Sequence, residues 1–98
     1  MKVSLPVSAQ NTWSAPFELL GDAHYAGKPA RALVSVVQGT ADSTVTLRRY
    51  SGSTVIQSLT MTEGQVVEVP ATGMYDIGVA TGDFGTGTIT ITVEQDRP

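Results

Sequence analysis

Hydrophobic and polar residues alternate along most of this chain with a period of two. The clearest case is residues 88–93, Thr-Ile-Thr-Ile-Thr-Val, where Ile89, Ile91 and Val93 fall on one face and the three threonines on the other. β-Branched residues pack well on the pleated surface of a sheet and lose side-chain freedom in a helix. This segment is therefore predicted to be a β-strand with one buried face.

The same alternation recurs along the chain between turn residues. Residues 43–50 and 74–80 each place their apolar side chains on one face. Turn signals separate such segments about every 8–12 residues, a spacing typical of an antiparallel sandwich or small barrel. The pattern predicts an all-β fold: a single antiparallel β-sandwich, jelly-roll or Ig-like, with about seven or eight short strands. We expect strands at residues 3–7, 17–20, 31–38, 43–50, 53–61, 65–69, 74–80 and 88–93.

Residues 31–38 depart from simple alternation, because their apolar side chains fall on both faces. A strand buried on both faces has this composition. A central strand with one face turned toward a partner or a covering loop would have it too. The pattern leaves both interpretations open.

The 98 residues correspond to one domain, residues 1–98. Residues 1–15 are expected to form an N-terminal arm with an edge strand, because Pro6 lacks the N–H that an inner strand would need. Residues 94–98 form a charged tail that is expected to fray. The chain is further expected to have a loop at residues 21–29, turns at residues 39–42 and 63–64, and a tight hairpin at residues 51–52.

The amino-acid composition argues against several classes of function. The chain has no cysteine, which excludes disulfides and thiolate zinc sites. Six basic residues face nine acidic ones, the net charge is −3, and the longest basic cluster is Arg48–Arg49, so no electrostatic footprint for nucleic acid is present. The longest apolar run is shorter than the roughly 20 residues that cross a bilayer. We expect no signal peptide, no membrane partner and no nucleic-acid partner.

Candidate chemistry is sparse. His24 is the only histidine, and a Ser-His-Asp triad would have to include it, but no nucleophile-elbow motif accompanies it. The carboxylates are scattered singly, without the spacing of a calcium loop. Residues 82–87 contain Asp-Phe-Gly but no other kinase signature, and we expect a hairpin loop whose glycines supply positive φ. No catalytic, cofactor or metal residue is predicted, and the chain is not expected to be an enzyme.

Aromatic and arginine side chains are the remaining functional candidates, because such residues are enriched at protein interfaces. Trp13 and Phe17 lie outside the strongest strands and are either contact residues or plugs at the end of the core. Phe84 is either a lid on the core or a contact residue. Arg48 points outward on the alternation of its strand. The protein-interface candidates are Trp13, Phe17, Tyr25, Arg48, Tyr50 and Phe84.

Three blocks of the chain carry a family resemblance. They are residues 11–19 (Asn-Thr-Trp-Ser-Ala-Pro-Phe-Glu-Leu), residues 43–50 (Ser-Thr-Val-Thr-Leu-Arg-Arg-Tyr) and residues 74–88 (Met-Tyr-Asp-Ile-Gly-Val-Ala-Thr-Gly-Asp-Phe-Gly-Thr-Gly-Thr). Together they resemble a family of small β-sandwich virion accessory proteins of tailed bacteriophages, which are head decoration (cement) or tail-associated proteins. The hairpin at residues 51–52 lacks the family's following tryptophan, and residues 22–29 resemble an insertion.

The resemblance implies a virion structural protein without enzymatic activity or cofactor. The leading hypothesis is a capsid decoration protein that stabilises the head by contacts with the major capsid protein or other virion proteins. It would be made in the bacterial host cytoplasm, located in the virion, and assembled as a homo-oligomer, with a trimer favoured. The alternatives are a tail or neck adaptor or fibre-base module of the virion, and a carbohydrate-binding β-sandwich module with exposed aromatic residues.

Overall fold

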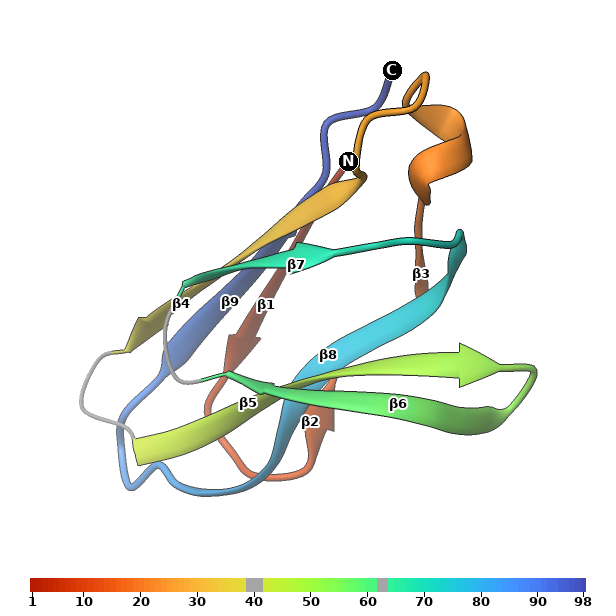
Figure 1. The fold of residues 1–98 in the computed structure, drawn as a ribbon. Helices are drawn as coiled ribbons and strands as arrows, with labels where there is room; N and C mark the ends of the chain where they lie inside the picture. The colour runs from red at the N-terminus through yellow and green to blue at the C-terminus, as the bar shows by residue number, and fades with distance from the viewer. Residues whose placement is uncertain (39–41, 62–63) are drawn as a thin grey trace.

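The structure, a computed structural model, describes residues 1–38, 42–61 and 64–98. Two antiparallel β-sheets pack face to face, as Figure 1 shows, and the all-β antiparallel sandwich expected from the alternation is confirmed. The turns expected at residues 39–42 and 63–64 fall largely outside the described residues. In the described residues, no helix has the length and apolarity needed to cross a membrane.

The described chain forms nine strands, slightly more than expected. They are β1 (Lys2–Val7), β2 (Thr12–Trp13), β3 (Phe17–Leu19), β4 (Arg31–Gln38), β5 (Asp42–Ser51), β6 (Thr54–Met61), β7 (Gln65–Glu68), β8 (Gly73–Asp83) and β9 (Ile89–Glu94). The additional strand is β2, whose two residues lie in a polar segment without alternation. A short 3-10 helix, η1 (Asp22–His24), occupies part of the segment expected to be a loop.

The first sheet has the strand order β1-β9-β4-β7, and the second has the order β2-β8-β5-β6, with β3 also paired to β8. The edge position expected for the strand that contains Pro6 is observed, since β1 ends the first sheet. The segment between β8 and β9 crosses from one sheet to the other, so the hairpin expected at residues 82–87 is wrong. Of its three glycines only Gly85 has a positive φ, of 50°.

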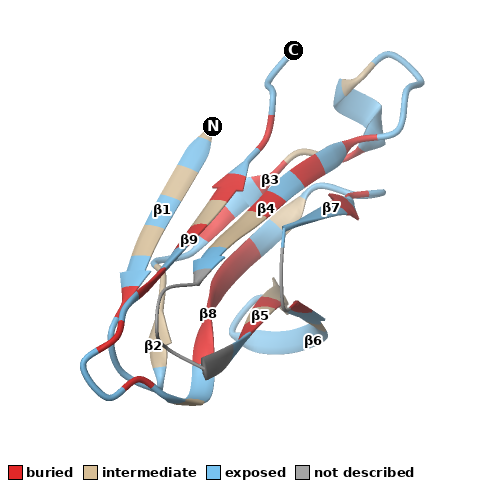
Figure 2. Cartoon of the chain, turned by 90° about the vertical axis from the view of Figure 1, so that its left-hand side faces the viewer, coloured by how far each residue is buried: buried red, intermediate tan, exposed pale blue. Residues whose placement is uncertain are grey.

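The core lies between the inward faces of the two sheets, which Figure 2 colours as buried. Ile89, Ile91 and Val93 have no exposed surface, as the alternation of their strand predicted. Val55 and Ile56 are both exposed, and the pairing of β6 with β5 shifts register between Arg49 and Tyr50. The face of β6 was ambiguous in the sequence for this reason: its period of two is broken by a bulge. The largest fully buried side chains are Leu19, Leu47, Met61, Ile77, Ile89, Ile91, Val7, Val34, Val45, Val69, Val79 and Val93.

Strand β4 is buried on one face only. Ala32 and Val34 are buried, whereas Leu33 and Val37 are 45% and 66% exposed. The interpretation of this strand as buried on both faces is therefore wrong for the isolated chain, because its outer face carries exposed apolar side chains.

The hairpin between β5 and β6 turns one residue later than expected. Ser51 and Thr54 pair across it, so the two turn residues are Gly52 and Ser53. Gly52 has a φ of 62°, a left-handed conformation that glycine adopts without steric cost. The glycine therefore decides where the chain reverses.

Hydrogen bonds tie the C-terminal tail to the body of the chain as far as Arg97, where the sequence had predicted fraying. Glu94 belongs to β9, and Gln95 is only 2% exposed. The Gln95 Oε1 accepts a hydrogen bond from the Leu20 N–H, and its Nε2 donates one to the Leu20 carbonyl, both at 2.8 Å. Arg97 Nη2 donates to the carbonyl of Glu18 at 2.8 Å. A polar tail residue thus satisfies backbone groups at the end of β3 that the core would leave unpaired.

Candidate protein-interaction surfaces

The outer face of the second sheet carries a partly buried ion pair. Arg48 on β5 and Asp76 on β8 are directly opposite each other in the antiparallel register. Arg48 Nε donates to Asp76 Oδ1 at 2.8 Å and Arg48 Nη2 to Asp76 Oδ2 at 2.6 Å, a two-pronged pairing that fixes the guanidinium plane. The Tyr50 hydroxyl donates to Asp76 Oδ2 at 2.9 Å. One carboxylate thus holds two of the sequence-predicted side chains.

Trp13 covers this pair from the neighbouring strand. Trp13 lies on β2, directly opposite Gly78 on β8. The Arg48 Cζ atom lies 3.4 Å from the centroid of the Trp13 ring, which is a cation–π contact. A Cβ atom at position 78 would lie 2.8 Å from Trp13 Cα, so only glycine lets β2 approach this closely. We call Trp13, Arg48, Tyr50 and Asp76 the Arg48 cluster.

The electrostatics of the Arg48 cluster favour a fixed pair over an acid–base centre. The hydrogen bond to Asp76 is the main reason that the pKa of Arg48 is raised above its ordinary value. Desolvation, followed by the hydrogen bond to Asp76, raises the pKa of the Tyr50 hydroxyl. Arg48 and Tyr50 therefore each keep one protonation state at neutral pH, and both stay hydrogen-bonded to Asp76.

A pocket opens beside the Arg48 cluster, with a cavity volume of about 390 Å³. Met74, which is 42% exposed, contributes an apolar wall, and Tyr50 and Asp76 contribute the polar one. The remaining lining residues come from the β5–β6 turn and from Pro16. The pocket is large enough for one side chain of a partner protein.

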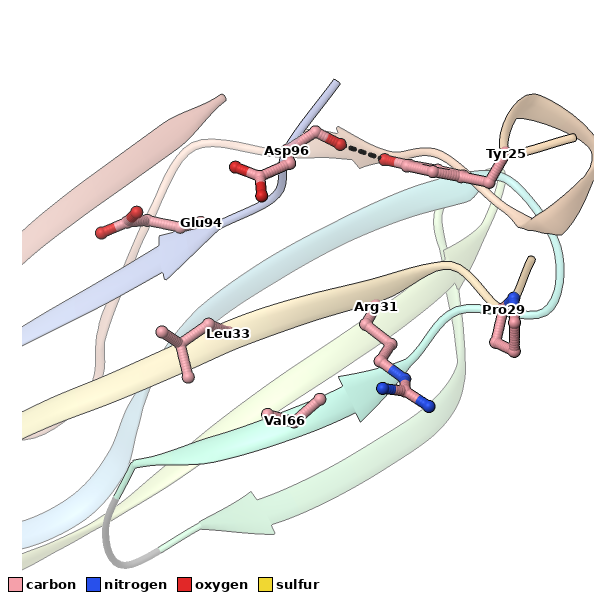
Figure 3. A pocket seen from close by; sticks show the side chains of 7 residues that line it. All are labelled: Tyr25, Pro29, Arg31, Leu33, Val66, Glu94 and Asp96. Atoms are coloured by element: carbon pink, nitrogen blue, oxygen red, sulfur yellow. Dashed lines mark hydrogen bonds between the residues drawn. The ribbon is translucent and has the colours of Figure 1, made fainter. Parts of the chain in front are cut away.

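A second pocket lies on the outer face of the first sheet, and Figure 3 shows it from close by. Its volume is about 460 Å³, and we call it the Leu33 pocket. Leu33 on β4 and Val66 on β7 are neighbours in register and form its apolar part. The residues that line it are Tyr25, Pro29, Arg31, Leu33, Val66, Glu94 and Asp96.

The rim of the Leu33 pocket is charged and polar. Arg31 lies on the side of β7, and Glu94 and Asp96 lie on the side of β9 (Figure 3). The Tyr25 hydroxyl donates to the main-chain carbonyl of Asp96, which ties the segment after η1 to the C-terminal tail. An apolar centre with a polar rim is the usual layout of a protein–protein contact.

The six sequence-predicted interface residues separate into three groups. Trp13, Arg48 and Tyr50 come together in the Arg48 cluster, and Tyr25 lies across the molecule at the Leu33 pocket. Phe17 and Phe84 are only 9% and 7% exposed and pack into the core, which is the other of the two roles that the sequence left open for each. Both rings plug the sandwich, because β3 and the segment after β8 direct them inward, away from solvent.

The residues that sequence reasoning missed are Asp76, Leu33 and Val66. Asp76 occupies an outward position on a strand whose alternation was recognised, but its partner follows only from the register between β5 and β8. Leu33 did carry a signal, since it lies on the second apolar face of residues 31–38. His24 is exposed in η1. No group of three or more His, Cys, Asp or Glu side chains in the described part of the chain is arranged to hold a metal ion.

No protein family model matches the chain, and no curated protein sequence matches it. Among solved structures, the chain is similar to one from work described as "Bacillus endospore appendages form a novel family of disulfide-linked pili". The two share 19% sequence identity with a TM-score of 0.44, over 100% of this chain and 87% of that chain.

Proposed function

We propose that this protein is a structural, docking protein of a bacteriophage virion, a decoration protein that binds the outer surface of the capsid. Its action is protein–protein contact and not catalysis. The observation that carries the docking role is the open outer face of the first sheet, where Leu33, Val37 and Val66 are 45%, 66% and 56% exposed. Exposed apolar side chains gathered on one face and rimmed by charges mark an interaction site.

The proposed place in a virion rests on the family resemblance. The three sequence blocks that carry this resemblance lie next to one another in the fold. Residues 11–19 contain β2 and β3, which both pair with β8, in residues 74–88. Residues 43–50 lie in β5, which pairs with the other edge of β8. Three blocks distant in sequence thus form one continuous part of the second sheet. The two departures from the family pattern lie outside it, in η1 and in the β5–β6 turn.

The carbohydrate-binding alternative has less support in this geometry. A sugar stacks on an open aromatic face, but the guanidinium of Arg48 lies 3.4 Å from the Trp13 ring centroid and occupies that face. The hydroxyl of Tyr50 is engaged by Asp76. We therefore favour the two virion roles over glycan binding.

Co-sedimentation with expanded capsids tests the proposal. The variant Leu33→Thr/Val66→Thr removes the apolar centre of the Leu33 pocket and places at both positions a β-branched side chain that suits a strand. We expect at least about 10-fold weaker capsid binding, because buried apolar anchors dominate such interfaces. Val55→Thr, the same kind of change at an exposed site on the other sheet and outside both pockets, is the control and should bind like the wild type.

Two results would decide against it. Equal capsid binding by the wild type and the double variant would remove the first-sheet face as the docking surface. Absence of the wild-type protein from purified virions would remove the virion role itself. Immunogold labelling separates the two virion locations: many copies over the shell support decoration, and labelling at one vertex supports the tail or neck alternative.

A further inference from the structure

Strand β6 is an open edge of the second sheet. It is the last strand in the order β2-β8-β5-β6, and in residues 42–61 and the rest of the described chain no strand pairs with its outer side. The side chains of residues 54–58 are all exposed. Figure 1 shows the β5–β6 hairpin reaching past the first sheet, which leaves β6 uncovered. Alternate backbone N–H and C=O groups of such a strand are free to pair with another strand.

The other described edges are protected. β1 carries Pro6, which cannot donate to a ladder, and the charged Lys2. β7 has four residues, and β2 and β3 have two and three. β6, by contrast, is eight residues long, Thr-Val-Ile-Gln-Ser-Leu-Thr-Met, without charge, proline or glycine. The bulge in its pairing with β5 is the one such guard that β6 carries. Natural sheets usually guard an edge of this length and composition further, so its openness points to a binding role.

We propose that β6 pairs antiparallel with β6 of a second copy of this chain, about a twofold axis, so that two second sheets join into one continuous sheet. An antiparallel strand can pair with its own copy because the same backbone groups meet in reversed order. The pairing is isologous and gives a dimer, in contrast to the trimer that the family resemblance favours.

The identity of the occupant follows from charge. Each chain carries a net charge of −3, so two copies repel each other unless they meet along a neutral surface. β6 supplies one, because reversal of an uncharged strand on itself places no like charges opposite each other. The strand also lacks any charged side chain that would select a foreign charged peptide. Pairing would shield Val55 and Ile56, which are 40% and 55% exposed.

The area buried by the pairing of two β6 strands indicates how tightly two copies would bind. Eight residues extend about 27 Å, and with side chains on both faces such a pairing buries roughly 500 Å² of each copy. A standard stable interface buries about 800 Å² per partner. The dimer is therefore a weak one, with a dissociation constant in the micromolar range or above. The Leu33 pocket is on the other sheet and stays free, so the pairing does not depend on capsid docking.

Sedimentation equilibrium from about 1 μM to 1 mM protein, without capsids, tests the pairing. We expect the wild-type mass to rise from 10.3 kDa toward twice that value. The variant Ile56→Lys/Thr60→Lys adds charges along the exposed edge, and its dissociation constant should increase at least about 10-fold. Ser4→Lys/Thr90→Lys adds the same charge to exposed positions of the first sheet and should dimerise like the wild type.

Amide hydrogen exchange supplies a second measurement that does not depend on the variants. In the concentrated wild type, amides of β6 should exchange more slowly than in the dilute protein, while the rates in β1 stay the same. A wild-type mass of 10.3 kDa at all concentrations would overturn the proposal, and so would a trimer mass or undiminished dimerisation of the β6 variant. Capsid binding measured separately distinguishes this failure from failure of the proposed function.

Discussion

Asp76 decides the arrangement of the outer face of the second sheet. It is a carboxylate that is only 5% exposed, and a buried charge is tolerated only when it is paired and hydrogen-bonded. Arg48 and Tyr50 supply these partners from the adjacent strand, and Trp13 covers the guanidinium. The sequence predicted the outward direction of Arg48. It did not identify Asp76, because cross-strand partners depend on register and not on the pattern within one strand.

Replacement of Asp76 should therefore cost stability out of proportion to its size. In Asp76→Ala, Arg48 and Tyr50 lose their common acceptor, and a partly buried guanidinium is left unpaired. We expect the free energy of unfolding to fall by about 3 kcal/mol. Urea denaturation measures this change. Glu94→Gln, which removes the exposed ion pair with Lys2 at 3.6 Å, should change it by no more than about 0.5 kcal/mol.

Tyr75 gives the protein a defined sensitivity to alkali. Burial raises the pKa of its hydroxyl above the ordinary 10.0, and this outweighs the opposite effect of Arg49, whose guanidinium lies 5.9 Å from the ring centroid. The folded state favours the neutral phenol. The corresponding stability is complete below the unfolded pKa and is lost as the pH rises through the raised folded pKa.

Urea denaturation from about pH 8 to about pH 11 should show this loss. Tyr75→Phe cannot ionise, so its free energy of unfolding should fall less steeply than that of the wild type above about pH 10. Parallel curves for the two proteins over this range would show that burial of Tyr75 does not control the alkaline limit.

At the scale of elements, β2 shows how a strand can form without a sequence pattern. Its two residues pair with Gly78 and Val79, and the missing side chain of Gly78 creates the space for it. Alternation of apolar and polar residues cannot predict so short a strand, because a pattern with a period of two cannot be recognised in only two residues. The pairing depends instead on a close approach that only the partner strand permits.

Gly78→Ala should displace β2. The added Cβ would lie 2.1 Å from the Thr12 carbonyl oxygen, and backbone cannot yield as a flexible side chain can. We expect a loss of about 2–3 kcal/mol and altered fluorescence of the single tryptophan, which leaves its contact with Arg48. Gly64→Ala is the control, since its Cβ would meet its nearest neighbour at 3.5 Å. Unchanged fluorescence in Gly78→Ala would contradict the tight packing of β2.

The C-terminal tail is a second element that required the tertiary structure. Gln95→Ala leaves the N–H and carbonyl of Leu20 without their hydrogen bonds in a part-buried site, and we expect it to cost about 2 kcal/mol. Thermal unfolding measures the difference. Asp96→Ala keeps the main-chain carbonyl that Tyr25 binds and should unfold near the wild-type temperature. Equal unfolding temperatures for both variants would restore the picture of a frayed tail.

The whole molecule is stabilised by the apolar side chains between its two sheets. Ile91 lies on β9, between β1 and β4, and has no exposed surface. Ile91→Ala should lower the free energy of unfolding by about 2–5 kcal/mol, because it leaves a cavity that the rigid sheets cannot fill. Val37→Ala, at a site 66% exposed, should change it by no more than about 0.5 kcal/mol. Chemical denaturation of the two variants compares the inner and outer faces of one sheet.

The pattern of apolar and polar residues was enough to predict the fold class, most strand positions and the inward faces of β5, β8 and β9. The physical reason is that alternation is a property of each strand alone. It indicates which side chains are buried, whichever strand lies alongside. It also indicated that Arg48 points outward and that residues 31–38 have two apolar faces.

Which strands are neighbours became known from the folded chain alone, because pairing depends on contacts between residues distant in sequence. The tertiary structure placed Asp76 beside Arg48, turned Phe17 and Phe84 into the core, and exposed Leu33. It also left β6 at an open edge. A strand's own sequence specifies its two faces, but it does not specify whether another strand covers its edge. The proposed docking and pairing surfaces both depend on which faces and edges the fold leaves uncovered.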